Sequence, residues 1–251
     1  MIPASGHLFF VNDLTRPALA DEDAHHAERV LRIRSGEEIS VSDGVGGWRR
    51  CRFGSALEPI SEVVVEPPSA WPITVAFALT KGAKPEWVVE KLTEVGVDRV
   101  AGFVGDRSVV RWDDSRTGRA VERWRAVARG AAMQSRRAWL PEILGVVSLI
   151  SLQGDHSGAR VGAGAGVVRA DRDGRPLDLD VRTVLIGPEG GWSEDERSGV
   201  PASVSLGPTV LRAETAALVA GAALADLRWR SALEPSGRSD DPGTEQGDPG
   251  T

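Results

Sequence analysis

The chain has 251 residues, 41% of them hydrophobic, and a formal net charge of -6. This length allows one large domain or two modest ones with a real core, and no stretch approaches the roughly 18 apolar residues needed to cross a membrane. The single cysteine, Cys51, excludes an intramolecular disulfide and a thiolate metal cluster. Because the N-terminal residues also lack the pattern of a secretion signal, we expect a cytoplasmic protein with no membrane or metal partner.

Charge is distributed unevenly along the chain. Residues 1–70 and residues 234–251 each carry a net charge of -4, whereas residues 71–233 carry +2. The overall acidity argues against a nucleic-acid partner, but the segregation hides a locally basic surface in the middle of the chain.

The first part of the chain predicts a small β-barrel. Short strand-like runs lie at residues 7–11, 38–42, 49–57 and 61–66, and glycine-containing hairpin turns lie at 43–44 and 46–47. Residues 23–32 predict a short helix with an acidic start between the first two strands. Arg32 and Arg34 follow as candidate RNA contacts, although solvated surface arginines are about as common.

A stiff proline-rich segment at residues 67–72 predicts a domain boundary, which we place at residue 70. The apolar run 73–79 then predicts a buried parallel strand. Residues 86–95 predict a helix with one apolar face, and residues 99–104 the next strand. This order predicts an α/β domain with a parallel sheet over residues 71–233. The composition of residues 234–251 predicts a disordered tail.

Residues 116–137 form the most basic segment, with seven arginines against Glu122 alone. Its apolar residues can pack on one side while guanidinium groups, whose planar forks suit phosphates, face outward. A charge run is usually a solvated helix face, but this excess in an acidic protein favours RNA contact, Arg129 included.

A glycine-rich stretch at residues 162–166 resembles a dinucleotide-binding fingerprint, but no third glycine and helix follow. We expect a small-residue strand over 158–170, whose bare backbone lets a cofactor approach, and then a charged turn at 171–174. The next strand is expected at 181–186.

Two later stretches share one pattern. Residues 184–193 read as a strand, a Gly-Pro turn and two more glycines, followed by a capping box from Ser193 to Glu196. Residues 204–217 read as a strand, a second Gly-Pro turn and a helix that opens near Arg212. Glycines let the backbone approach a ligand, and unpaired N–H groups at a helix start can bind it. Either stretch alone is a weak signal.

The last helix is expected from Arg212 to about residue 233. It carries an apolar stripe that suits the core or a dimer interface: Thr215, Leu218, Val219, Ala222 and Ala223.

Together these motifs resemble the 16S ribosomal RNA uracil-N3 methyltransferases, a family of the SPOUT superfamily. Residues 187–191 match the family's Gly-Pro-Glu-Gly-Gly, and residues 206–216 match its Leu-Gly-x-x-Val-Leu-Arg-x-Glu-Thr-Ala. Residues 25–37 follow the pattern of its N-terminal PUA-like domain. The segment from Gln134 through Ser135 to Arg136 follows its Glu-Gln-Ser-x-Arg motif, with Met133 where the family usually has glutamate.

The resemblance implies an N-terminal PUA-like β-barrel and a C-terminal knotted SPOUT methyltransferase domain. It also implies a homodimer that acts on 16S rRNA in the small ribosomal subunit, with Gln134, Ser135 and Arg136 among the RNA contacts. The loops of the knot would hold S-adenosylmethionine through Ile186, Gly187, Pro188, Glu189, Gly190, Gly191, Ser205, Leu206, Gly207, Val210, Leu211 and Thr215.

The chemistry of uracil N3 makes specific demands. N3 is a poor nucleophile until it loses its proton, and a cation near the uracil carbonyls or a placed base favours the anion. The family motif puts Arg212 at the mouth of the pocket as this cation. Glu189 or Glu214 could accept the proton or orient the arginine, and their ordinary roles would be a turn acceptor and a helix-dipole partner.

Two other functions remain open from the sequence. One is a SPOUT enzyme that methylates a ribose 2′-OH, and the other is a non-catalytic RNA-binding factor in ribosome assembly. The first makes a different methylated nucleoside, and the second retains RNA without affinity for S-adenosylmethionine.

Overall fold

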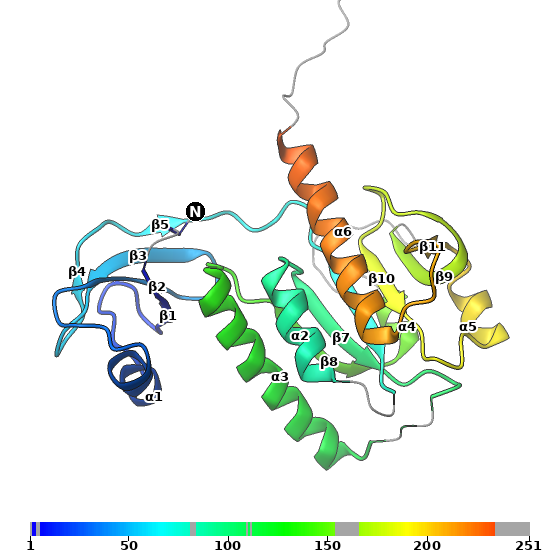
Figure 1. Ribbon diagram of the computed structural model, residues 1–251, viewed down its shortest axis with the longest axis horizontal. Coiled ribbons are helices and arrows are strands. Elements are labelled where there is room, and N and C mark those ends of the chain that lie inside the picture. The colour runs from blue at the N-terminus through cyan, green and yellow to red at the C-terminus, as the bar shows by residue number, and fades with distance from the viewer. Residues whose placement is uncertain are drawn as a thin grey trace, which may run out of the picture.

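The computed structural model describes residues 2–3, 6–80, 84–108, 110, 112–153 and 166–233. An N-terminal unit and a larger α/β unit follow one another along the chain (Figure 1). Residues 81–83, most of the glycine-rich stretch (162–165) and the predicted tail (234–251) lie outside the described residues.

The N-terminal unit is built on a five-stranded sheet. Its strands are β1 Leu8–Phe10, β2 Glu38–Ser42, β3 Gly47–Arg52, β4 Glu58–Pro59 and β5 Val64–Val65. β1 pairs in parallel with β2, and β3 pairs antiparallel with β2, β4 and β5. The strand predicted at 49–57 has the wrong bounds, because the chain bends after β3 and returns as β4. The predicted helix is α1 Asp21–His25 followed by a π-helical turn, η1 His26–Val30.

The second unit contains a six-stranded, all-parallel sheet in the order β11-β9-β10-β6-β7-β8. The strands are β6 Thr74–Ala78, β7 Arg99–Phe103, β8 Glu142–Val147, β9 Val167–Pro176, β10 Thr183–Ile186 and β11 Ser203–Ser205. The helices are α2 Pro85–Glu94, α3 Asp114–Ser135, α4 Leu149–Gln153, α5 Glu194–Gly199 and α6 Ala213–Leu233. The predicted α/β fold with a parallel sheet is confirmed.

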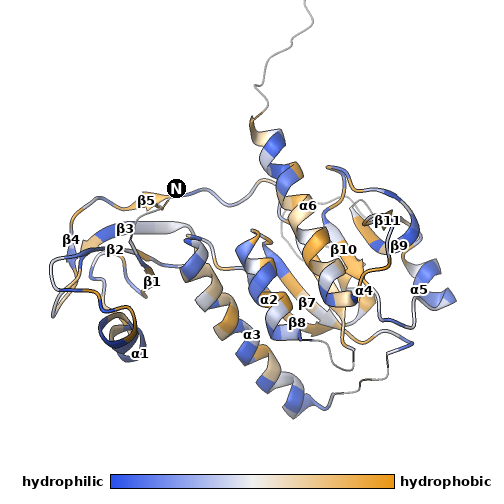
Figure 2. Cartoon of the chain, viewed as in Figure 1, coloured by the Kyte–Doolittle hydropathy of each residue, from blue (hydrophilic) through white to orange (hydrophobic). Residues whose placement is uncertain are grey.

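Both faces of this sheet are covered. Along β6, Val75 and Phe77 point into a core shared with α2, α3 and α6, whereas Ala76 and Ala78 point into a smaller core with Leu152 and other residues of the opposite face. Strand side chains alternate between faces, so burial on both sides explains why this strand reads as a continuous apolar run. Figure 2 shows α3 with mixed apolar and polar turns, as expected for a helix that covers such a sheet.

The chain takes an indirect path near its C-terminal end. From β10 it crosses beyond β9 to form the edge strand β11, and it then returns as α6 to pack on β6, β10 and α2. A return of this kind is compatible with the knot that the resemblance implies, and the threading itself stays a prediction.

The charged turn predicted at residues 171–174 is wrong, because these residues belong to β9. The sequence Asp-Arg-Asp-Gly is typical of a turn, but Gly174 lies against the backbone of β11. A Cβ atom there would lie 2.3 Å from the carbonyl carbon of Val204. The close approach of two strands therefore explains this glycine.

The stripe predicted on α6 is not the face that enters the core. The buried residues of α6 are Ala213, Ala216, Ala217, Ala220, Gly221 and Leu224. The predicted stripe lies on the opposite side of the helix, where its residues are exposed or half-buried. Of the two roles that the sequence left open for this stripe, core packing is therefore wrong.

The C-terminal part of α3 joins the two units. Ala132 and Ala138 share a buried cluster with Leu8, Phe10 and Trp48 of the N-terminal unit. The chain after α3 continues this contact, since the N–H of Leu140 donates to the carbonyl oxygen of Gly44 at 2.9 Å and the hydroxyl of Ser42 donates to that of Ala138 at 3.0 Å. Met133 packs against the same cluster, so this departure from the family motif adds an apolar contact between the units.

An ion pair reinforces this interface. Nη2 of Arg129 lies 2.5 Å from Oδ2 of Asp23 and Nη1 lies 3.0 Å from Oδ1, so the two side chains meet fork to fork. Nη2 also donates to the carbonyl oxygen of Phe10 at 3.3 Å. The carboxylate of Asp23 is only 11% exposed.

Arg129→Ala is expected to lower the free energy of unfolding by about 2 kcal/mol, because the carboxylate of Asp23 stays buried without its partner. Arg125→Ala is the matched control. Arg125 lies one turn earlier on α3, is exposed and has no side-chain partner among the described residues, so its loss is expected to cost less than about 0.5 kcal/mol. Urea denaturation of both variants measures the difference, and equal midpoints would contradict a role for the ion pair.

Candidate functional site

The two glycine-rich stretches leave the same edge of the parallel sheet. β10 and β11 both pair in parallel with β9, and their registers bring Leu185 and Ser203 level with Arg169. The register of β11 on β9 then shifts between Ser203 and Val204, so that Ser205 pairs with Pro176, but both strands still run toward the same edge of the sheet. The loops at residues 187–192 and 206–212 therefore both begin at the carboxyl edge, where open α/β sheets bind ligands. We call them the first loop and the second loop.

The first loop is a tight turn that packs on Trp192. A Cβ atom at Gly187 would lie 2.8 Å from the indole ring, so the backbone passes against its face. Gly191 has a φ of +72°, and its N–H donates to the carbonyl oxygen of Pro188 at 2.9 Å. Trp192 itself stacks on Phe103 at 5.9 Å between ring centres, and its Nε1 donates to the carbonyl oxygen of Ala170 at 2.9 Å. The loop is thus held in one shape by a buried aromatic pair.

The predicted capping box at the start of α5 is present. The Oγ of Ser193 accepts from the N–H of Glu196 at 3.1 Å, and Oε2 of Glu196 accepts from the N–H of Ser193 at 2.8 Å. The box fixes where the first loop ends and the helix begins.

The loop after β7 contacts the first loop, although the sequence did not single it out. Nη1 of Arg107 donates to the carbonyl oxygen of Gly190 at 3.1 Å. The hydroxyl of Ser193 donates to Oδ2 of Asp106 at 2.5 Å, and the N–H of Asp106 donates to Oε1 of Glu196 at 3.0 Å. The sequence could have indicated this loop only by its position, because it follows a parallel strand and therefore lies at the edge of the sheet where ligands bind.

The second loop presents open backbone and an exposed apolar side chain. Gly207 has a φ of +133°, and a Cβ atom there would meet nothing within 4 Å. Val210 is 85% exposed. In the described part of the chain, the N–H groups of Val210 and Leu211 have no hydrogen-bond partner. Free amides beside an exposed apolar surface suit a heterocyclic base such as adenine.

The three candidate catalytic residues lie in or beside these loops. Arg212 directly precedes α6 and is exposed, and its guanidinium contacts no described residue through a hydrogen bond or ion pair. Glu214 is half-buried in the first turn of α6, and Glu189 is exposed in the first loop. Within the described residues neither carboxylate is engaged by another side chain, so all three groups are available to a ligand.

A buried arginine supports the segment between the two loops. Nη1 of Arg169, on β9, donates to the carbonyl oxygens of Val200 at 2.8 Å and Pro201 at 2.9 Å. Its Nε lies 3.5 Å from Oδ2 of Asp171, which also pairs with Arg197 of α5 at 2.7 Å. Arg169 is only 8% exposed. This cluster therefore fixes α5 and the start of β11 onto β9.

Arg169→Met is expected to destabilise the protein by about 3 kcal/mol, because two carbonyl groups and a carboxylate lose their charged donor. Arg172→Met is the control, since Arg172 lies on the same strand with an exposed side chain that makes no described contact. Thermal unfolding monitored by circular dichroism compares the two. A loss of stability in the Arg172 variant as large as in the Arg169 variant would contradict the assignment.

The candidate RNA contacts divide into engaged and free side chains. Arg129 is paired with Asp23, and Arg136 donates through Nε and Nη2 to the carbonyl oxygen of Gly6 at 3.2 and 2.8 Å. Both arginines therefore hold the two units together, and their predicted contact with RNA stays a prediction. The hydroxyl of Ser135 donates within α3 to the carbonyl oxygen of Ala131 at 2.7 Å. The side chains of Arg32, Arg34 and Gln134 have no partner among the described residues.

Other arginines of α3 remain near the surface. Arg116 lies over the ring of Trp112 at 5.1 Å, Arg119 donates to Ser115, and Arg123 pairs with Glu86 at 3.2 Å. The predicted basic face is therefore present on the N-terminal half of α3, where exposed pairs of this kind are weak enough to exchange for phosphate.

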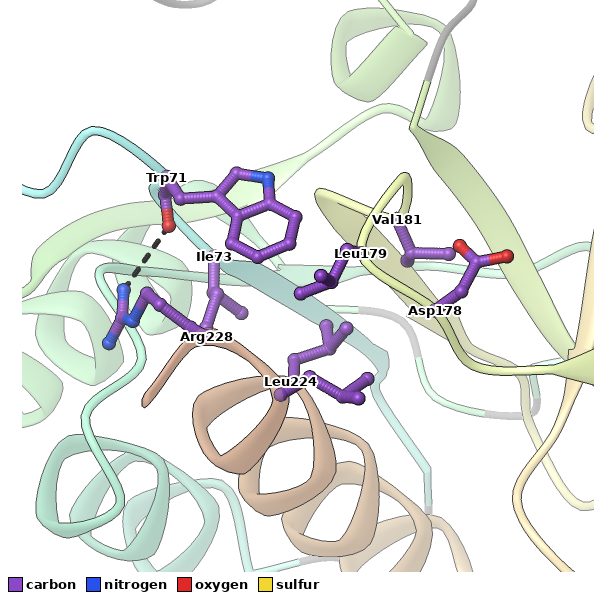
Figure 3. Close-up of a pocket in the computed structure, with 8 residues that line it drawn as sticks. Trp71, Ile73, Asp178, Leu179, Val181, Leu224 and Arg228 are labelled. Atoms are coloured by element: carbon purple, nitrogen blue, oxygen red, sulfur yellow. Dashed lines mark hydrogen bonds between the residues drawn. The ribbon is translucent and has the colours of Figure 1, made fainter. Parts of the chain in front are cut away.

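Two hollows lie at the opposite, amino edge of the sheet. The smaller one, about 10 Å³, has room for about one water molecule. Figure 3 shows it between Trp71, Leu179 and Leu224, with Arg228 donating to the carbonyl oxygen of Trp71 at 3.3 Å. Arg182 stacks 4.0 Å above Trp71, and burial lowers the pKa of its guanidinium. A hollow of this size at this edge is unrelated to the two loops.

The larger hollow is a cleft of about 870 Å³ between the two units, lined by the linker and by residues that precede β7 and β8. Asp98 organises it by pairing with Arg228 at 2.5 Å and Arg137 at 3.8 Å. Burial lowers the pKa of Arg137, which is turned inward toward the carbonyl oxygens of Thr93 and Val97. Positive and negative side chains balance in this cleft, so it has no preference for a polyanion.

The described residues form neither a metal site nor a membrane span. Among the described residues no group of three or more His, Cys, Asp or Glu side chains is arranged to hold a metal ion. No helix in the same residues is long and apolar enough to cross a membrane.

Comparison with known proteins identifies close relatives. Residues 67–225 match the RNA methyltransferase domain family, and residues 19–62 match the RNA methyltransferase PUA domain family. Ribosomal RNA small subunit methyltransferase E of Mycobacterium bovis is 37% identical over 88% of this chain and 93% of that relative. The Bacillus subtilis protein of the same name is 30% identical over 82% of this chain and 88% of its own length.

A solved structure shares the fold. Ribosomal RNA small subunit methyltransferase E from Neisseria gonorrhoeae, bound to S-adenosyl methionine, superposes with a TM-score of 0.69 at 24% identity, covering 89% of this chain and 98% of that one. The likeness extends over both units.

Proposed function

This chain belongs to the family of the ribosomal RNA small subunit methyltransferases E, and we propose that it methylates uracil N3 in 16S rRNA with S-adenosylmethionine as donor. The observation that supports the proposal is that two glycine-rich loops follow parallel strands on either side of β9 and so leave the same, carboxyl edge of the sheet. The division into an RNA-binding unit at residues 1–70 and a methyltransferase unit at residues 71–233 is part of the same proposal.

The loops fit S-adenosylmethionine in three respects. The first loop offers a main chain that carries no side chain of its own at Gly187, Gly190 and Gly191. The second loop offers the unpaired amides of Val210 and Leu211. The exposed side chain of Val210 offers apolar contact to a purine ring.

The remaining residues proposed for this site continue the two loops. They are Ile186, Pro188, Glu189, Ser205, Leu206, Gly207 and Thr215. When bound, the donor supplies an electrophilic methyl group on its sulfonium.

The residues beside the loops favour deprotonation of the acceptor. Arg212 places a permanent positive charge at the exposed start of α6, where it stabilises the negative charge that develops on the uracil carbonyl oxygens. The candidate carboxylates are Glu214, two residues after Arg212, and Glu189, in the first loop, and one of them accepts the N3 proton or orients Arg212. Because N3 lies on the pairing edge of uracil, the target nucleotide is unpaired or rotated out of its helix.

The proposed RNA contacts lie on the N-terminal unit and at its junction with the second unit. Arg32 and Arg34 supply phosphate contacts from the N-terminal unit, and Gln134 and Ser135 flank the junction of the two units. Arg129 and Arg136 act indirectly, by keeping the N-terminal unit in position.

Incubating the protein with small ribosomal subunits lacking this modification and S-adenosylmethionine is expected to produce 3-methyluridine in 16S rRNA, measured by mass spectrometry of nucleosides. Arg212→Ala is expected to slow this at least about 100-fold, as loss of a transition-state charge does, whereas Arg172→Met leaves the rate unchanged. A 2′-O-methylated nucleoside would favour ribose methylation. RNA retention without affinity for S-adenosylmethionine would favour a non-catalytic assembly factor.

We further propose that the protein acts in the cytoplasm as a homodimer paired through α6. The stripe opposite the buried face of α6 carries Leu218, Val219 and Ala222. Beyond Asp226 the same side of the helix carries Trp229 and Leu233. Trp229 is 63% exposed and Leu233 is 62% exposed. A row of large apolar side chains on a helix surface is typical of a protein interface.

Trp229→Glu is expected to convert the dimer into a monomer, because a charge would be buried at the interface without a partner. Ala232→Glu, exposed on another side of the same helix, is the control and leaves the dimer intact. Size-exclusion chromatography with light scattering measures the mass. A wild-type protein that is monomeric at all concentrations would contradict the proposal.

A further inference from the structure

We propose that Glu196 is a positioning residue for the cofactor, because its buried carboxylate ties the first loop to the loop after β7. The inference rests on the proposed binding of S-adenosylmethionine by the first loop, and it assigns a role to a residue that itself lies outside that loop. Glu196 is 7% exposed, which is unusual for a glutamate that has no positively charged partner among the residues that the structure describes.

The carboxylate is divided between two loops. Oε2 accepts from the N–H of Ser193, at the end of the first loop, at 2.8 Å. Oε1 accepts from the N–H of Asp106, in the loop after β7, at 3.0 Å. One buried charge therefore joins two separate backbone segments. Asp106 and Ser193, whose N–H groups donate to it, are 87 residues apart in the sequence.

Three further contacts run across the same junction. The hydroxyl of Ser193 donates to Oδ2 of Asp106 at 2.5 Å, and Arg107 donates to the carbonyl oxygen of Gly190 at 3.1 Å. Gly105 leaves the space that the carboxylate occupies, since a Cβ atom there would lie 3.2 Å from Oε1 of Glu196 and 3.4 Å from Pro188. The junction thus fits closely around Glu196 and reaches into the first loop at Pro188 and Gly190.

Helix capping alone does not account for this arrangement. A capping box needs one oxygen of the residue at the third helical position, and Oε2 fulfils that need. The second oxygen is used for the tether to the loop after β7. Hydrogen bonds to a buried carboxylate are stronger than those between neutral groups, so this tether restrains the first loop in the shape that binds the cofactor. Because the loop is already ordered, less of the binding free energy of the cofactor is spent on ordering it.

Glu196→Gln tests the tether, because the amide keeps the size of the side chain but replaces one acceptor oxygen with a donor that faces an N–H group. Isothermal titration of the full-length protein with S-adenosylmethionine is expected to show an affinity at least about 10-fold weaker than wild type. Glu194→Gln is the matched control. It removes the same charge from the same helix turn, where Glu194 is exposed, and its affinity is expected to equal that of wild type.

A second variant separates positioning from stability. Asp106→Ala removes the partially exposed bond to Ser193 and leaves the capping box intact, so it is expected to weaken affinity about 3-fold with little change in melting temperature. The double variant Glu196→Gln with Asp106→Ala is expected to lose less than the product of the two effects, because both changes release the same loop. Asp106→Ala keeps the N–H that donates to Glu196, so if the Glu196 variant does not fold, Gly105→Ala, whose Cβ would lie 3.2 Å from Oε1 of Glu196, tests the tether by the same loss of affinity.

The outcomes distinguish this inference from the function on which it rests. Wild type that does not bind S-adenosylmethionine overturns both. Wild-type binding together with unchanged affinity in folded Glu196→Gln and Asp106→Ala variants overturns the positioning role alone. A lower melting temperature with unchanged affinity assigns Glu196 to helix capping only and also overturns it.

Discussion

The structure depends on the parallel alignment of β9, β10 and β11. Because β10 and β11 both run in the direction of β9, the two glycine-rich stretches must leave the same edge of the sheet. They do so although 15 residues, helix α5 among them, lie between Gly191 and Gly207 in the sequence. An antiparallel β11 would place the second loop at the amino edge. Gly174 and Arg169 serve this alignment directly, the glycine by admitting the backbone of Val204 and the arginine by holding the carbonyl groups that precede β11.

The arginines of α3 show how one helix serves two purposes. Toward its C-terminal end, Arg129 and Arg136 reach across to the N-terminal unit, while the exposed arginines of its first half pair only with weak or local partners. The sequence identified the charge excess and its amphipathic side correctly. It could not show which guanidinium groups are used internally, because their partners, Asp23 and the carbonyl oxygen of Gly6, are more than a hundred residues away.

Sequence patterns predicted the elements whose signals are local. The capping box at Ser193, the long basic helix and the buried strand β6 all follow from neighbouring residues. The turn predicted at Asp171 was wrong, because a long-range strand contact overrode a local turn preference. The core face of α6 was not predictable, since alanine-rich segments are apolar on both sides and periodicity cannot choose between them. The loop holding Asp106 has no motif of its own, and only the fold brings it to the site.

The shared core around Ala132, Ala138 and Trp48 has a consequence for how these proteins can be divided. The methyltransferase unit completes its own sheet and helices, yet the end of α3 and the residues after it use the N-terminal unit as their cover. Without the N-terminal unit, the larger unit would expose this hydrophobic surface next to Arg129, which would have lost its partner Asp23. We therefore expect the larger unit to aggregate when it is produced alone. The two units thus depend on each other for solubility, and separating them is expected to cause aggregation even where the catalytic residues are unchanged.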